Sequence, residues 1–145
     1  MNLWPDGQSG QSGQSGQRTN EGWQAMEYEF TTGAPITEAA ALAQVAAMGF
    51  HGLAFDDVQE HDETLHWHEF ASVAWVISGT GSFADEHGNV TRTGPGCHLE
   101  APAGWLHRSL AGTHQRIVLG TNLPAEVWTS PINKDPAERQ AALST

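Results

Sequence analysis

The sequence of 145 residues has few basic side chains and a single cysteine, Cys97. One cysteine cannot form an intrachain disulfide framework or a Cys-x-x-Cys metal or redox motif, so we expect a reducing compartment. Lysine and arginine total 6 against 17 acidic residues, and the net charge of -11 stays negative even when all 8 histidines are protonated. Nucleic acids and anionic membrane surfaces attract basic chains, so the composition argues against both as partners.

Long apolar runs and a secretion signal are also missing. No window approaches the roughly 20 apolar residues that a membrane span requires. The amino-terminal MNLWPDGQSG contains neither the basic nor the apolar region of a signal peptide, so we predict a cytoplasmic protein. A chain of this length buries roughly two-thirds of its unfolded surface, so one compact domain needs no disulfide or partner subunit to be stable.

The composition changes along the chain and indicates where the domain lies. Residues 7–17 repeat Gln-Ser-Gly, which is too polar and glycine-rich to order by itself. We predict a flexible leader over residues 1–22, one domain over 23–130, and a polar tail over 131–145 that lies on the surface. Function is therefore expected within the middle segment.

Helix and strand signals divide this domain into two parts. Residues 36–48 have helix-forming composition, with a start at Thr37 or Glu38 and a stop at Gly49. Beyond Gly49, short apolar or alternating runs are separated by turn residues, a pattern typical of an all-β sandwich or barrel. The predicted strands are 51–55, 65–77, 81–85, 89–93, 97–101 and 116–120. Turns are expected at 79–81, 86–89, 94–96 and 102–104, and a small terminal helix at 135–136.

Two histidines stand out in the predicted strand LHWHEF. Alternate side chains of a strand share a face, so His66 and His68 project together while Trp67 and Glu69 point to the other side. His107 follows a Pro-x-Gly turn, near the start of a strand that can lie beside the first. Three converging neutral imidazoles suit Zn, Fe, Ni, Cu or Mn and leave coordination positions open for water or substrate.

The stretches around these histidines resemble the paired motifs of the cupin family. The first motif, His-x-His with a following glutamate and glycine, corresponds to His66, His68, position 72 and Gly79. The second motif corresponds to Gly96, Pro102, Gly104, His107 and position 111, where the family has asparagine. The resemblance covers residues 66–111 and implies a cupin barrel, a jelly-roll-like and RmlC-like double-stranded β-helix. It also implies a homodimer, which would cover exposed edge strands.

Two positions depart from the family pattern. Ser72 replaces the glutamate ligand, and Ala111 replaces the asparagine. Ser72 has the parity of the first two histidines and should face the site, but a neutral hydroxyl is a poor ligand for a divalent ion. A three-histidine site remains, and its uncompensated charge favours an anionic or enolisable substrate. Glu100, which shares one strand face with His98, is the alternative acid.

The resemblance implies a small metal-dependent enzyme, such as a dioxygenase-like oxidoreductase that acts on a small organic acid or dicarbonyl. In this hypothesis His66, His68 and His107 hold the metal, and Ser72 or Glu100 steers a proton. Two alternatives stay open, because one barrel supports unrelated activities. One is a non-catalytic module that binds or senses a small ligand, and the other is a metal-independent sugar isomerase or epimerase.

Three further side-chain assignments follow from position. Phe70 has the same parity as His66 and His68, and we expect it to line the metal cavity. The acidic run 56–63 lacks the glycine and final glutamate of an EF-hand loop, so we expect a solvated loop without calcium. The lone Tyr28, which an isomerase would need in the cavity, lies outside the matched motifs.

Overall fold

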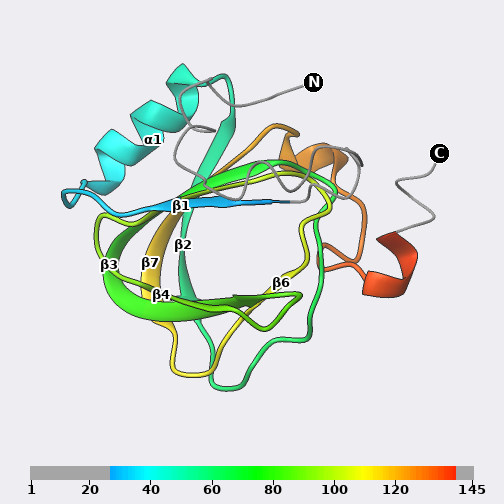
Figure 1. The fold of residues 1–145 in the computed structure, drawn as a ribbon. Helices are drawn as coiled ribbons and strands as arrows, with labels where there is room; N and C mark the ends of the chain where they lie inside the picture. Colours follow the sequence, from blue (N-terminus) through cyan, green and yellow to red (C-terminus); the bar gives the residue numbers. More distant parts are fainter. Residues whose placement is uncertain (1–26, 140–145) are drawn as a thin grey trace.

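The computed structural model describes residues 27–139, so the predicted leader over residues 1–22 lies outside the described part of the chain. These described residues form an antiparallel β-structure with one α-helix (Figure 1). In chain order the elements are β1 (Glu29–Thr31), α1 (Glu38–Ala47), β2 (His51–Val58), β3 (Ser72–Asp85), β4 (Val90–Thr93), β5 (His98–Ala101), β6 (His107–Ser109), β7 (His114–Thr121), and the 3-10 turns η4 (Ala125–Val127) and η5 (Pro136–Glu138). The predicted all-β fold with one short helix is confirmed.

The long strand β3 takes part in both halves of the barrel. Its first half pairs with β5 and β7 in a sheet of order β1-β5-β3-β7-β2. Its second half, from Gly81 to Asp85, pairs with β4 and β6. The register between β3 and β7 shifts between Val76 and Ser78, and such a β-bulge bends the strand. The bend carries β3 around the barrel, as Figure 1 shows.

The helix α1 packs on the outside of this barrel (Figure 1). Its N-cap is Thr37, whose side chain accepts a hydrogen bond from the first turn, and Gly49 follows its end with a φ of 79°. The core between helix and sheet consists of Ala41, Val45, Val73 and Val118. Since Val73 faces the helix, the neighbouring positions of β3 face the interior of the barrel. Among the described residues, no helix has the length and apolar character to cross a bilayer.

The predicted strand over residues 65–77 is wrong in its first half, because β3 begins only at Ser72. Residues 65–71 instead make two isolated bridges, His66 with His107 and Trp67 with Lys134. These bridges keep the chain extended, so alternate side chains still point to opposite sides. The reason for placing His66 and His68 on one face therefore holds without a continuous strand.

The predicted turn at residues 79–81 is also wrong, because these residues lie inside β3 beside the bulge. Gly79 has a φ of 82°, and a Cβ there would overlap the carbonyl oxygen of His114 on β7. The glycine permits close packing of two strands and does not reverse the chain. The other three predicted turns connect the strands as expected.

Candidate metal centre

A cavity of about 470 Å³ lies inside the barrel. Side chains from β2, β3, β6 and β7, from the segment between β2 and β3, and from Trp128, Ile132 and Asn133 line it. Its apolar lining includes Phe55, Phe70, Ile117, Leu119 and Trp128. Among the described residues that line it, three are acidic, Asp56, Asp57 and Glu63, and none is a lysine or arginine. The cavity thus combines an apolar interior with negative charge.

The three predicted histidines come together in this cavity. One ring nitrogen of each lies within 4.8 Å of those of the other two, and the ring centroids are 4.6 to 5.0 Å apart. His66 and His107 are joined by their bridge, in which each backbone N–H donates to the other's carbonyl at 3.0 and 2.9 Å. His68 follows two positions later on the same side, so pairing between the two motifs explains the convergence.

A backbone carbonyl fixes the orientation of each imidazole. The Nδ1 atoms of His66, His68 and His107 donate to the carbonyls of Thr64, Ile132 and Trp105 at 2.6, 3.1 and 3.0 Å. Because a carbonyl oxygen only accepts, Nδ1 carries a proton and Nε2 keeps its lone pair for a metal. Metal-ligating histidines are generally held by such a bond from the second ring nitrogen. The residues present therefore fit a transition metal.

Burial keeps two of these imidazoles neutral. The pKa of His107 is lowered to about 3 by its burial and then by the nearby His68 and His66. Burial also lowers the pKa of His68 to about 4, although its hydrogen bond to the Ile132 carbonyl acts in the opposite direction. A metal binds only the unprotonated ring, so protons compete weakly with a metal at neutral pH.

Aromatic rings pack against two of the histidines. Phe70 stacks on His68 with centroids 4.9 Å apart, and Trp105 stacks on His107 at 4.3 Å. Trp128 stacks in turn on Phe70 at 4.7 Å. The prediction that Phe70 lines the cavity is confirmed. These rings restrict the imidazoles and exclude water from one side of the site.

The C-terminal segment that begins at residue 131 contributes to the site. The sequence did not predict this contribution. Its described part, residues 131–139, is largely exposed, as predicted, yet Ile132 and Asn133 line the cavity and the Ile132 carbonyl holds His68. The indole N–H of Trp67 donates to the Asp135 carbonyl at 2.9 Å, which fastens the segment to the first motif. Figure 1 shows this segment on the side of the barrel away from α1. These contacts join residues more than 60 positions apart, and no local pattern signals them.

The single lysine of the chain, Lys134, organises this segment. Its Nζ donates to the Thr129 carbonyl, the Thr129 hydroxyl and the Pro131 carbonyl at 3.2, 2.9 and 2.8 Å. Its backbone N–H and carbonyl pair with those of Trp67. The loop that presents the Ile132 carbonyl is therefore folded around one ammonium group.

We expect Lys134→Met to weaken metal binding about tenfold, because a loosened Ile132 carbonyl no longer fixes the ring of His68. Titration calorimetry with Zn²⁺ measures the dissociation constant. The matched control is Arg92→Met, which removes an exposed cation from β4. Equal affinities for the two variants would mean that the segment does not orient His68.

The two acid-base candidates from the sequence lie on different faces of the sheet. Ser72 lines the cavity with the histidines. Glu100 is only 4% exposed but is not among the described residues that line the cavity. It lies opposite Val73, whose side chain packs toward α1, and its carboxylate is 3.8 Å from Nε2 of His98. The structure thus brings Ser72 to the site and places Glu100 away from it.

The buried Glu100 predicts a measurable pH dependence of stability. Burial, and then the nearby Glu29, raise its pKa from 4.5 to about 7. Between these pH values the folded state keeps a proton that the unfolded state has released, so the stability contributed by Glu100 falls as the pH rises. Glu100→Gln lacks this titrating group. The difference in unfolding free energy between the variant and the wild type should therefore shift in favour of the variant by roughly 2–3 kcal/mol from pH 4.5 to pH 8.

Urea unfolding of the metal-free proteins at several pH values checks this expectation. The difference between variant and wild type is the informative quantity, since the buried His98, His68 and His107 contribute to the pH dependence of both proteins. The pKa of His98 is itself lowered by burial, so its contribution has the opposite slope. Parallel curves for the two proteins would contradict the assignment of the pH dependence to Glu100.

No family model and no curated protein sequence matches the chain. Solved structures are similar to it in fold. Acireductone dioxygenase from Bacillus anthracis, with a cadmium ion in the active centre, is 15% identical with a TM-score of 0.48 over 77% of this chain and 87% of that one. An RmlC-like cupin from Shewanella frigidimarina is 13% identical with a TM-score of 0.44, over 53% and 69%. The polyketide cyclase RemF from Streptomyces resistomycificus is 22% identical with a TM-score of 0.45, over 61% and 66%.

Proposed function

We propose that this small cupin domain is a metal-dependent, dioxygenase-like oxidoreductase that acts on a small dicarbonyl compound. The observation that carries the proposal is the set of three imidazoles in one largely apolar cavity, each with Nδ1 bound to a carbonyl. Three such donors hold Fe, Zn, Ni or Mn and leave coordination positions open for a substrate.

When bound, the metal would supply Lewis acidity and, as iron, the capacity for oxygen chemistry. The chain's own residues would bind and orient the substrate. The stacked rings of Phe70 and Trp128 offer a flat apolar wall to a planar molecule. The Ser72 hydroxyl, on the same lining, would donate a hydrogen bond to a substrate oxygen.

The charge of the cavity favours a dicarbonyl over an organic acid. Asp57 and Glu63 line it, and no lysine or arginine of the described residues does so. A substrate carboxylate would meet like charges without the guanidinium or ammonium group that usually pairs with it. A neutral diketone avoids this repulsion, and its enol form offers two oxygen ligands to a metal.

The sugar isomerase alternative finds no support in the position of Tyr28. Its ring packs against Phe83 and Trp105, with centroids 5.6 and 4.6 Å away. Tyr28 is not among the described residues that line the cavity. It would thus not reach a sugar bound beside the histidines.

Oxygen uptake tests the proposed function. Protein purified without a metal column is stripped with a chelator and reloaded with Fe²⁺ or Zn²⁺, and oxygen consumption is followed with a simple β-diketone. We expect oxygen uptake only with Fe²⁺. Both atoms of ¹⁸O₂ should appear in the cleavage products, because a dioxygenase transfers both oxygen atoms to its substrate and needs no external reductant.

A matched dicarboxylic acid serves as the comparison substrate. Faster uptake with the acid than with the diketone would contradict the substrate class. Stoichiometric metal binding without oxygen uptake on either compound would overturn the enzyme proposal in favour of a ligand-binding module.

A further inference from the structure

The proposed metal centre lacks a negatively charged ligand within the family motif. Ser72 occupies the position of the family glutamate, so a divalent ion on three imidazoles would keep its full charge. An uncompensated dication in a largely apolar cavity is strongly unfavourable. The structure must therefore offset this charge with a group outside the motif, or leave it for the substrate.

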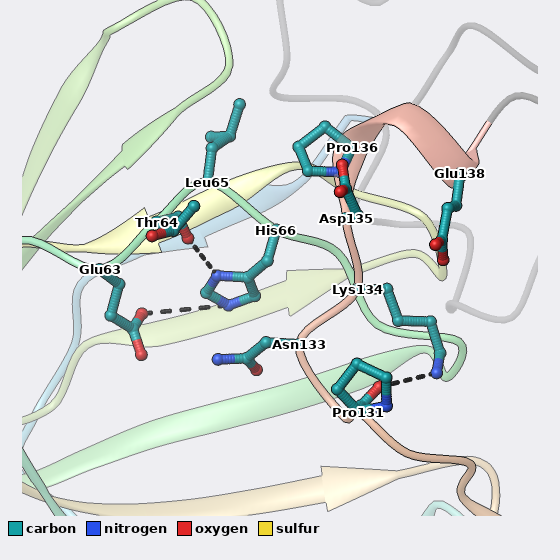
Figure 2. Close-up of a pocket in the computed structure, with 10 residues that line it drawn as sticks. All are labelled: Glu63, Thr64, Leu65, His66, Pro131, Asn133, Lys134, Asp135, Pro136 and Glu138. Atoms are coloured by element: carbon teal, nitrogen blue, oxygen red, sulfur yellow. Dashed lines mark hydrogen bonds and ion pairs between the residues drawn. The ribbon is translucent and has the colours of Figure 1, made fainter.

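The carboxylate of Glu63 lies beside His66, one of the three histidines. Glu63 belongs to the acidic run 56–63, which the sequence predicted to be a solvated loop. Instead, the first residues of the run belong to β2, and the Glu63 side chain is only 24% exposed and lines the cavity. Its Oε1 is 3.9 Å from Nε2 of His66, as the dashed line in Figure 2 shows.

These two facing atoms are both acceptors. Figure 2 shows the other nitrogen of the His66 ring directed at the Thr64 carbonyl, to which it donates at 2.6 Å. Nε2 is therefore the lone-pair nitrogen, and a carboxylate oxygen also only accepts. Two hydrogen-bond acceptors therefore face each other without a proton between them. A cation bound to both atoms would make this contact attractive.

The separation is close to what a shared ion requires. Ligand atoms about 2.1 Å from a tetrahedral metal are roughly 3.4 Å apart. The observed distance between Nε2 of His66 and Oε1 of Glu63 is 3.9 Å. Rotation about one side-chain bond of Glu63 is enough to move Oε1 by the difference between these two distances. Glu63 thus lies within reach of an ion bound by His66.

Hydrogen bonds hold the Glu63 carboxylate in this position. Oε1 accepts from the backbone N–H of Ser109 on β6 at 2.9 Å, and Oε2 accepts from the Gln59 side chain at 3.4 Å. Gln59 also donates to Asp57 at 2.9 Å, which ties the carboxylate to β2. The backbone of Glu63 pairs with Ser109 as well, since its N–H donates to the Ser109 carbonyl. The position of the carboxylate is set by two strands that line the cavity.

We infer that Glu63 supplies the carboxylate of the metal centre, in place of the glutamate that the family has at position 72. The inference rests on the proposed function in one respect, because it requires that the three histidines bind a metal. Glu63 approaches from the loop after β2, whereas the family ligand would come from β3. The carboxylate of the site would thus come from the segment between β2 and β3, and not from β3 itself.

The test compares Glu63→Gln with Glu60→Gln. The first variant keeps the size of the side chain and an acceptor for Ser109, and removes the charge beside His66 together with the long 3.4 Å hydrogen bond from Gln59. The second removes the same charge from an exposed position in the same loop. Titration of the chelator-stripped full chain with Zn²⁺, and with Co²⁺ followed by visible absorption, gives the dissociation constants.

We expect Glu63→Gln to weaken binding of both ions about 10- to 100-fold and to alter the Co²⁺ absorption spectrum. Glu60→Gln should leave both readouts within about twofold of wild type, since an exposed charge in water is screened. Thermal unfolding of the metal-free variants should match wild type, which separates loss of the carboxylate from loss of the fold.

The possible failures are distinguishable. If wild type binds neither ion, the proposed function fails together with this inference. If wild type binds metal and Glu63→Gln binds it equally well, only the role of Glu63 is overturned, and its carboxylate serves only to accept the hydrogen bonds from Ser109 and Gln59. An equal loss in both variants would also overturn it, because the effect would then be one of net charge.

Discussion

Replacing both His66 and His68 with alanine is expected to lower metal affinity on the order of 10⁴-fold. A four-ligand zinc site is worth about 10–16 kcal/mol, or roughly 3 kcal/mol per ligand. Loss of two ligands thus removes about 6 kcal/mol, and each 1.4 kcal/mol is a factor of about ten. Elemental analysis of protein purified without a metal column, together with Zn²⁺ titration, measures the change.

The control for this experiment replaces His61 and His87 with alanine. Both are exposed, and neither lines the cavity. This variant should retain the wild-type metal content. If the His66→Ala, His68→Ala variant also retained stoichiometric metal, the convergence of the histidines would have no bearing on metal binding.

Replacing Gly96 with alanine is expected to destabilise the fold by about 3–4 kcal/mol. Gly96 has a φ of 89°, and this conformation costs an alanine roughly 1–2 kcal/mol. A Cβ there would also overlap the Gly33 carbonyl oxygen and lie 2.9 Å from that of Ala34, so two backbone segments must separate at a cost of about 1–3 kcal/mol. For a chain of this size the unfolding midpoint should fall by roughly 10 °C.

Gly88→Ala is the matched control, because it separates backbone strain from the clash. Gly88 has a φ of 82°, but a Cβ there would have no heavy atom within 4 Å. We expect it to lose only the strain energy of about 1–2 kcal/mol. Urea unfolding of both variants in metal-free buffer makes the comparison. Equal losses would show that the contact with Gly33 does not restrict Gly96.

Local chemistry made the helix and most turns predictable. Thr37 caps α1 and Gly49 ends it, because capping and left-handed backbone depend on a few adjacent residues. The turn prediction failed at Gly79, where the glycine is required by packing between two strands. Gly79 looks like a turn residue in the sequence, but in the structure it lets β3 approach β7.

The identity of the three histidines was predictable for a similar reason. Their spacing within each motif gives the side on which a ring projects, and extended backbone preserves that side even though residues 65–71 form no continuous strand. The same parity placed Ser72 and Phe70 in the cavity. Parity could not decide whether Glu100 points into or out of the barrel, because the pairing of β5 with β3 determines which side chains of β5 face the interior.

The sequence by itself determined the histidines of the site, most of the turns, the helix and the alternation of side chains, since these depend on neighbours along the chain. Only the tertiary structure decided which distant groups surround the histidines. Glu63 reaches the site because its loop pairs with Ser109, and the Ile132 carbonyl reaches His68 across 64 positions. Such contacts form when the barrel closes, and closure depends on strand register and packing over the whole domain.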